Sequence, residues 1–202
     1  MKRIILPILG VFLLSIFSAF TPVQAPTAAA WKVDPVHSSV SFSVRHFFSD
    51  IVGSFDKFDA ELMFDETDLE GSSVNFTVQA ASINTNNEKR DGHLQSADFF
   101  DAETYPTMTF KSSSFKATEE KGTYHVTGTM TVKDVSQEIE IPIKFLGSMD
   151  HPRREGMKIG GFSAEFSIDR TTYKVGSGNF AATTTIGDEV TVKVNLETSS
   201  QS

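Results

Sequence analysis

Polar and apolar residues alternate with a period of two along most of this chain, which is the pattern of β-strands that bury one face. The clearest case is the segment 38–46. One of its faces carries Val40, Phe42, Val44 and His46. The same alternation recurs in the segments 55–65, 72–83, 107–118, 123–134, 137–149, 157–169 and 188–198. We therefore predict about eight strands.

Short segments rich in Gly, Asp, Glu and Lys separate these strands and are typical of turns. Strands at hairpin spacing, with hardly any helical pattern between them, predict a single antiparallel sandwich or barrel. Pro142 lies inside the segment 137–149, and proline cannot donate a hydrogen bond to a strand ladder. We expect that strand to be an edge or to have a bulge near Pro142.

The stretch TNNEKRDGHLQSADFFDAETYP, residues 85–106, departs from this alternation. Thr85 is followed three residues later by Glu88, which is the spacing of a capping box. A short helix is therefore predicted from about Asn86 to Leu94, as an insertion between strands near one end of the sheet. Two aromatic residues after this helix are expected to pack inward: Phe99 and Phe100.

The charged residues of the predicted helix allow two interpretations. Arg90, Asp91 and His93 have the chemistry of an anion clamp, an orienting carboxylate and a general base. Alternatively, Arg90 and Asp91 form ion pairs that fix the helix over the sheet, and His93 caps a carbonyl. We favour the structural interpretation. A serine triad has no support, because the chain contains no GxSxG motif.

The histidines are His37, His46, His93, His125 and His151, and their spacing forms no compact metal-binding motif. His46 and His93 are the pair that could meet in space to hold a metal, but we expect hydrogen-bonded structural roles for them. The chain has no cysteine, which excludes thiol nucleophiles, iron–sulfur clusters and cysteine-ligated zinc. We predict neither a metal nor a cofactor.

Residues 1–30 differ from the rest of the chain. Two basic residues precede an apolar run over residues 4–20, and small residues follow, which is the pattern of a cleaved signal peptide. A single membrane-spanning anchor is the competing interpretation. Cleavage just before Trp31 would leave one domain, residues 31–202, in the periplasm or outside the cell. We expect no stable insertion of this mature chain into a membrane.

Composition narrows the class of ligand. The formal net charge is −8, with 26 acidic against 18 basic residues, so nucleic acid is not expected as a partner. Eighteen phenylalanines stand beside one tryptophan and three tyrosines. Because phenylalanine has no polar group, so many of them are suited to fill or line an apolar interior.

In their order along the chain, several of these motifs resemble the YceI-like family of exported lipid- or polyisoprenoid-binding proteins. The resemblance spans residues 31–197 and rests on WKVDPVHSSVSFSVRH, on RDGHLQSADFF followed by YPTMTF, and on GFSAEFSIDR. It implies an all-β fold: an extended, lipocalin-like, eight-stranded antiparallel β-barrel with a short helical insertion. The chain departs from the family where TTYKVG follows Arg170 in place of an Asp-Phe-Gly-like run, and Tyr173 is expected to replace the aromatic residue.

The barrel implied by this resemblance would hold a long-chain lipid or isoprenoid in an apolar lumen. Residues expected to form that lumen and contact the ligand are Phe42, Val44, Phe58, Leu62, Phe76, Val78, Phe99, Phe100, Phe110, Phe145, Phe162 and Phe166. Candidate head-group contacts are His46, Arg90, His93 and Arg170. For Arg170, a buried carboxylate is the alternative partner.

Three functions follow, in order of preference. The first is non-enzymatic binding, transport or storage of a polyisoprenoid, an isoprenoid-quinone-like lipid or a fatty-acid derivative, with no catalytic residue. The second is a lipid-modifying enzyme that uses Asp91 and His93 as an acid–base pair. The third is a ligand-free structural or stress-related module. Each of these three functions is compatible with a homodimer.

Overall fold

The computed structural model describes residues 28–182 and 184–201. Their strands are β1 (Ala29–Val33), β2 (Ser39–His46), β3 (Ser49–Phe55), β4 (Phe58–Phe64), β5 (Ser73–Gln79), β6 (Ile83–Asn84), β7 (Thr107–Ala117), β8 (Thr123–Val132), β9 (Val135–Asp150), β10 (Met157–Asp169) and β11 (Ile186–Gln201). The helical elements are α1 (Glu88–Gln95) and the short 3₁₀ turns η1 (Ala80–Ser82) and η2 (Gly178–Phe180). No helix in these residues is long and apolar enough to cross a membrane.

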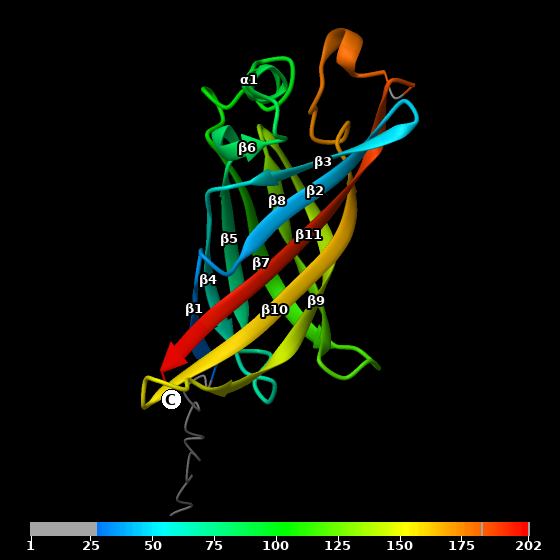
Figure 1. The fold of residues 1–202 in the computed structure, drawn as a ribbon. Helices are drawn as coiled ribbons and strands as arrows, with labels where there is room; N and C mark the ends of the chain where they lie inside the picture. The colour runs from blue at the N-terminus through cyan, green and yellow to red at the C-terminus, as the bar shows by residue number, and fades with distance from the viewer. Residues whose placement is uncertain (1–27, 183, 202) are drawn as a thin grey trace, which may run out of the picture.

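The strands form a closed antiparallel barrel (Figure 1). Eight of them make the ring in the order β1-β4-β5-β7-β8-β9-β10-β11, and β11 pairs back with β1. After the turn 34–38, β2 takes over from β1 as the partner of β11, and the hairpin strand β3 and the short β6 extend the wall at the end of the barrel where α1 lies. The predicted eight-stranded barrel with one helical insertion is confirmed.

Three strands were not predicted: β1, β3 and β6. β1 starts at Ala29, which pairs with Phe64, so the folded wall begins two residues before the predicted domain boundary at residue 31. The signal-peptide prediction covers residues 1–30, of which residues 1–27 lie outside the described residues.

The wall between β9 and β10 is only partly hydrogen-bonded. Their ladder runs from Asp150 opposite Lys158 to Ile143 opposite Ala164. Beyond it, in the part of the chain that the structure describes, residues 135–142 of β9 pair only with β8. Pro142 therefore lies where β9 is an edge, as the missing N–H of proline predicted.

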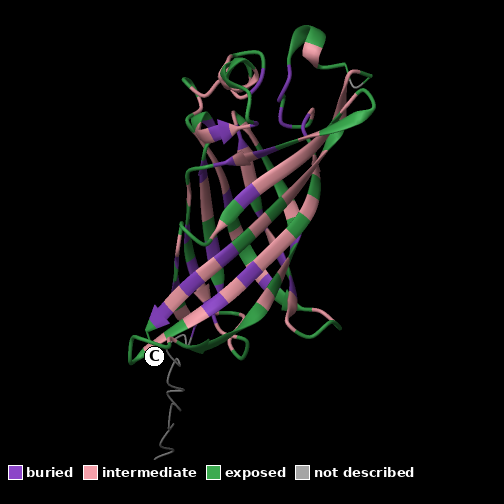
Figure 2. Ribbon diagram, viewed as in Figure 1, coloured by how far each residue is buried: buried purple, intermediate pink, exposed green. Residues whose placement is uncertain are grey.

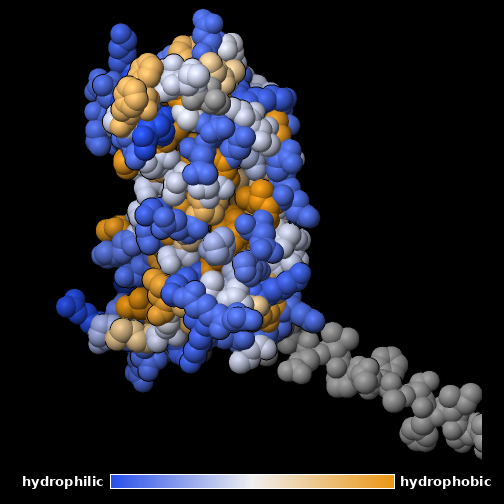
Figure 3. Space-filling model, turned by 90° about the vertical axis from the view of Figure 1, so that its right-hand side faces the viewer, coloured by the Kyte–Doolittle hydropathy of each residue, from blue (hydrophilic) through white to orange (hydrophobic). Residues whose placement is uncertain are grey.

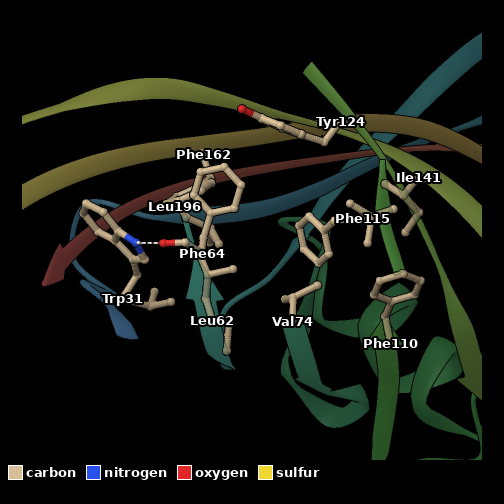
Figure 4. Close-up of a cluster of buried hydrophobic side chains, with 13 residues drawn as sticks. Trp31, Leu62, Phe64, Val74, Phe110, Phe115, Tyr124, Ile141, Phe162 and Leu196 are labelled. Carbon is tan, nitrogen blue, oxygen red and sulfur yellow. Dashed lines mark hydrogen bonds between the residues drawn. The ribbon is translucent and has the colours of Figure 1, made fainter. Parts of the chain in front are cut away.

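One end of the barrel is filled by aromatic side chains. The ring of Phe64 lies 5.1 Å from that of Phe145 and 5.3 Å from that of Phe162, and Trp31 packs edge-on to Phe162. Trp31 Nε1 donates a hydrogen bond of 3.1 Å to the carbonyl of Phe64 (Figure 4). This cluster continues toward the middle of the barrel through Phe110, Phe115, Val126 and Ile141. Its members come from alternate positions of the strands, and Figure 2 shows the same alternation of burial along β10 and β11.

The helix begins later than the capping box predicted. The N-cap is Asn87, whose side-chain oxygen accepts the backbone N–H of Arg90 at 3.0 Å. Thr85 is not the cap, because its hydroxyl oxygen accepts from Nε of Arg90 while the hydroxyl and the backbone N–H both donate to the carboxylate of Asp91. Glu88 therefore lies in the first turn of the helix, where its negative charge interacts favourably with the positive end of the helix dipole.

The turn between β1 and β2 is closed by an exposed ion pair. Asp34 accepts the backbone N–H of Val36 at 2.9 Å and lies 3.0 Å from Nδ1 of His37. Glu197 of β11 approaches the same nitrogen at 3.6 Å. The hydrogen bond that the His37 ring donates to Asp34, and then the charges of Asp34 and Glu197, raise the pKa of His37 above its ordinary value of 6.5.

We predict that Gly160→Ala destabilises the barrel. A Cβ at position 160 would lie 2.4 Å from the ring of Trp31, and the ring is fixed by its hydrogen bond to Phe64. The expected loss is about 1–3 kcal/mol of unfolding free energy, measured by denaturant titration. Gly92→Ala is the matched control, because nothing lies within 4 Å of that site and alanine favours a helix. Equal effects of the two substitutions would contradict this account of the packing.

We predict that the His37 ring titrates with a midpoint above 6.5 in NMR spectra of the folded protein. Because the pKa is raised by folding, the stabilisation is complete below pH 6.5 and is lost as the pH rises through the higher value. Asp34→Asn should lower the midpoint more than Glu197→Gln, since Asp34 provides the hydrogen bond. An unchanged midpoint in Asp34→Asn would show that this pair does not form.

Candidate ligand-binding cavity

An apolar cavity of about 210 Å³ lies in the barrel, between the filled end and the loops at the other end. Its wall is made of side chains from the barrel strands: Val40, Phe42, Val44, Phe76, Val78, Met108, Phe110, Met130, Val132, Ile141, Ala164, Phe166, Ile168, Ile186, Val190, Val192 and Val194. Phe55 of β3, Ile83 of β6, Thr109 of β7 and Leu94 of α1 also line the cavity, and the connections complete it with Phe99, Phe100, Arg170, Tyr173 and Val175. Almost all of this surface is hydrocarbon.

Strand register builds one side of the cavity in regular rows. Across β10, β11 and β2, the aligned positions are Ala164 with Val194 and Val40, Phe166 with Val192 and Phe42, and Ile168 with Val190 and Val44. Each row is two residues from the next, so all nine side chains point to the same face. The alternation along the three strands therefore produces a continuous apolar wall.

The predicted lumen residues divide into two groups. Eight line the cavity: Phe42, Val44, Phe76, Val78, Phe99, Phe100, Phe110 and Phe166. The other four face the interior but belong to the packed clusters outside the cavity lining: Phe58, Leu62, Phe145 and Phe162. Periodicity identifies the inward face of a strand but not the depth at which a residue lies, so this division could not be predicted.

Sequence reasoning missed much of the aliphatic wall. Val190, Val192 and Val194 alternate in the predicted strand 188–198, so the signal was present but was given less weight than the phenylalanines. Tyr173 and Val175 lie in the β10–β11 connection, where no periodic pattern marks them. Both are buried, and Tyr173 does occupy an interior aromatic position.

At the end of the barrel away from β1, the cavity lining includes residues of α1 and of two loops, and we call this end the cavity mouth (Figure 1). The segment after α1 accepts a hydrogen bond at the carbonyl of Asp98 from the backbone N–H of Ser177, at 2.7 Å. The ring of His93 lies 4.8 Å from that of Phe180, and its Nε2 is 3.0 Å from the Asp98 carboxylate. On the other side, Lys174 pairs with Asp134 at 2.8 Å. These contacts tie the 171–185 segment to both neighbours.

Arg170 organises the base of the 171–185 segment. It is only 4% exposed, and its guanidinium donates to four backbone carbonyls, at 2.7–3.0 Å: those of Val175, Phe180, Ile186 and Gly187. Burial lowers the pKa of this guanidinium, while Asp169 and Asp188 act in the opposite direction. Arg170 does border the cavity, but four of its five N–H groups serve the protein's own backbone. Its partners are carbonyls, not the carboxylate suggested as an alternative.

The charged residues of α1 do not face the cavity. Arg90 donates to the hydroxyl and to the carbonyl of Thr85, both at 2.7 Å, and Asp91 accepts from the same threonine. The two charges thus meet at Thr85 and not in the ion pairs that the structural interpretation expected. His93 contacts Asp98 and does not cap a carbonyl. Because Asp91 and His93 have different partners, they form no acid–base pair.

The remaining histidine candidates lie outside the cavity lining as well. His46 ends β2 and its ring packs edge-on against that of Phe47, at 4.7 Å. Among the described residues, Asp34, His37 and Glu197 have ligand atoms within 4.8 Å of one another. This group contains neither His46 nor His93. Its geometry is accounted for by the hydrogen-bonded turn described above.

Comparison with known proteins agrees with this architecture. The model of the YceI-like domain matches residues 31–198. A UPF0312 protein of Ectopseudomonas mendocina (strain ymp) is 37% identical over 151 residues, which cover 73% of this chain and 75% of the relative. The crystal structure of Burkholderia cenocepacia BcnA superposes with a TM-score of 0.73 at 28% identity, over 82% of this chain and 98% of that one.

A more distant neighbour is a polyisoprenoid-binding domain from Saccharophagus degradans implicated in plant cell wall breakdown. It has a TM-score of 0.63 at 15% identity, and the match covers 85% of this chain and 99% of that one. The fold and the cavity thus define a closed β-barrel with an apolar interior. This chain belongs to the YceI-like family.

We predict that Arg170→Lys lowers the unfolding free energy by about 2–3 kcal/mol, because lysine cannot reach four carbonyls at once. Arg45→Lys is the control: Arg45 is exposed, and its ion pair with Asp50 contributes about 0–1 kcal/mol. Denaturant titration measures both. A loss below about 0.5 kcal/mol in Arg170→Lys would show that the guanidinium does not organise the loop.

Proposed function

We propose that the protein binds a long-chain amphiphile in its cavity without chemical change. The class of ligand is a polyisoprenoid, an isoprenoid-quinone-like lipid or a fatty-acid derivative, and the role is transport or storage. The observation that carries the proposal is the cavity wall, in which the rows across β10, β11 and β2 are entirely hydrocarbon. The polyisoprenoid-binding neighbour with the same fold supports it.

The energetics of such a wall favour hydrocarbon and need no polar contact. Each buried CH₂ contributes about 0.8 kcal/mol, so a chain of ten such units would offset the ordering costs of binding. The cavity volume of about 210 Å³ is below the range of roughly 300–1,000 Å³ usual for small-molecule sites. The proposal therefore places one end of the chain in the cavity and the remainder, with the head group, at the mouth.

No comparable observation supports a catalytic function. Asp91 and His93, the pair considered for a lipid-modifying enzyme, contact Thr85 and Asp98 respectively, and neither borders the cavity. The third hypothesis, a filled barrel, is disfavoured by the cavity itself.

We place this activity in the periplasm or outside the cell, on the basis of the signal-peptide pattern in residues 1–30. The head group of the ligand would lie near the 171–185 segment and α1, which meet at the mouth.

We predict that protein exported by a bacterial host from the complete gene carries one long-chain lipid per chain in native mass spectra, and that its organic extract contains the same molecule. Ala164→Phe should lower the bound fraction at least about tenfold, because the ring would project into the cavity from the wall that Ala164 shares with its neighbour Val194. Ser163→Phe is the matched control, since its neighbours Asn195 and Lys144 are exposed on the outer face.

Ala164→Leu and denaturant titration of all three variants separate a blocked cavity from an overpacked fold. A bare mass for the wild type, also after incubation with isoprenoids and fatty acids, would overturn the proposal. The same spectra give the oligomeric state, and thus test for a homodimer. A chain that retained the predicted signal peptide, residues 1–30, after export would contradict that assignment.

A further inference from the structure

Two phenylalanines form the exposed tip of the β2–β3 hairpin. His46 pairs with Ser49, so Phe47 and Phe48 are the two residues of the turn. Phe47 is 56% exposed and Phe48 96% exposed. On β3, Val52 adds a third large apolar side chain at 63% exposure. Such a tip does not stabilise the fold in water, because its aromatic side chains stay exposed and are not buried on folding.

The backbone of this turn is also unfavourable for the residue it carries. Phe47 has φ +50°, in the left-handed region, whereas Phe48 does not. Two-residue hairpin turns with positive φ at the first position strongly favour glycine there, and bulky residues are rare. The hydrogen bond from the Phe47 N–H to the carbonyl of Thr185, at 2.9 Å, holds this conformation. Local stability would therefore select glycine, so the aromatic residue calls for a functional explanation.

The tip stands beside the cavity mouth. Phe47 bonds to Thr185, and the next residue, Ile186, lines the cavity and pairs with His46. Figure 1 shows the hairpin at the same end of the barrel as α1 and the 171–185 segment, far from the end filled by Trp31. Apolar side chains are visible at this end of the face in Figure 3.

Charge near the tip is balanced. The hairpin residues 39–55 carry one arginine and one aspartate, Arg45 and Asp50, which pair at 2.7 Å. Asp188 and Glu189 follow nearby at the start of β11 and add negative charge. Such a surface does not attract anionic lipids or nucleic acid. An apolar aromatic tip above a base with no excess of positive charge instead matches the boundary between the head groups and the acyl chains of a zwitterionic bilayer.

We propose that the Phe47–Phe48 hairpin docks the cavity mouth onto a lipid bilayer, so that a lipid can pass between the bilayer and the cavity. The exchange of lipid rests on the proposed function; the docking itself rests on the hairpin alone. The interaction is weak and reversible, because two side chains insert and no basic patch assists them.

The test is flotation of the wild-type protein with vesicles of zwitterionic phosphatidylcholine, compared with the double variant Phe47→Gly, Phe48→Ser. Glycine at position 47 suits the positive φ, so the variant should fold at least as well as the wild type. We expect its vesicle-bound fraction to fall on the order of tenfold. A tenfold higher salt concentration should not release the wild type.

The matched control is Leu146→Ser, Met149→Ser, which removes two similarly exposed apolar residues, 61% and 64% exposed, from β9. These residues belong to the stretch of β9 that pairs with the first residues of β10, at the end of the barrel away from the hairpin. The control should float like the wild type. Equal loss in both variants would show non-specific adsorption and overturn the proposal. So would vesicle binding that the double variant retains.

A second measurement separates docking from ligand binding. Lipid added from ethanol should enter the cavity of the double variant as well as that of the wild type, while extraction of the same lipid from vesicles should be impaired only in the double variant. Lipid uptake from ethanol without flotation of the wild type would refute docking and leave the proposed function intact. Flotation without uptake would refute the proposed function alone. If the wild type is a dimer that does not bind vesicles and the double variant is a monomer, the tip contacts a second copy of this chain. That result would overturn the inference.

Discussion

Closure of the sheet between β1 and β11 is the constraint on which the rest of the structure depends. Once the eight strands form a ring, every second side chain must point into a space of fixed width. That width is just enough for side chains to fill it or to leave room for one small ligand. Where rings meet, as for Phe64, Phe145 and Phe162, the interior is full. Where the inward side chains of β11 and β2 are paired valines, which are smaller than phenylalanines, space remains.

The two ends of the barrel differ in how backbone groups are satisfied. At the filled end, the strands and short turns satisfy the backbone groups by themselves. At the mouth, long connections need internal partners, and two side chains provide them. Arg170 donates to four carbonyls of the 171–187 region, and Thr85 accepts from Arg90 and donates to Asp91. The charged residues Arg90 and Asp91 therefore stabilise the loops at the mouth. The apolar cavity, and with it the proposed activity, depends on positions without any polar motif.

The mouth combines three features that fit one task. The loops over it are held by a few contacts, such as that of Ser177 with Asp98 and the ring contact of His93 with Phe180. The wall between β9 and β10 lacks part of its ladder. The hairpin tip places exposed aromatic rings beside the opening. The proposed lipid binding requires a ligand to enter at one end of the barrel, and the less tightly packed part of this barrel lies at that end.

The sequence by itself determined the fold class and the inward face of most strands, because a period of two is a local property that survives in any sheet. It predicted that Phe42, Phe76 and Phe110 point inward, and that Pro142 marks an edge. It missed β1, which lies beside the apolar N-terminal run, β3, which contains a glycine, and the two-residue β6, because none of these short runs alternates clearly. Only the tertiary structure decided the depth of each residue. Phe162 and Phe166 look equivalent in one strand, yet one lies in the filled end and the other lines the cavity, because depth follows from strand register around the closed ring.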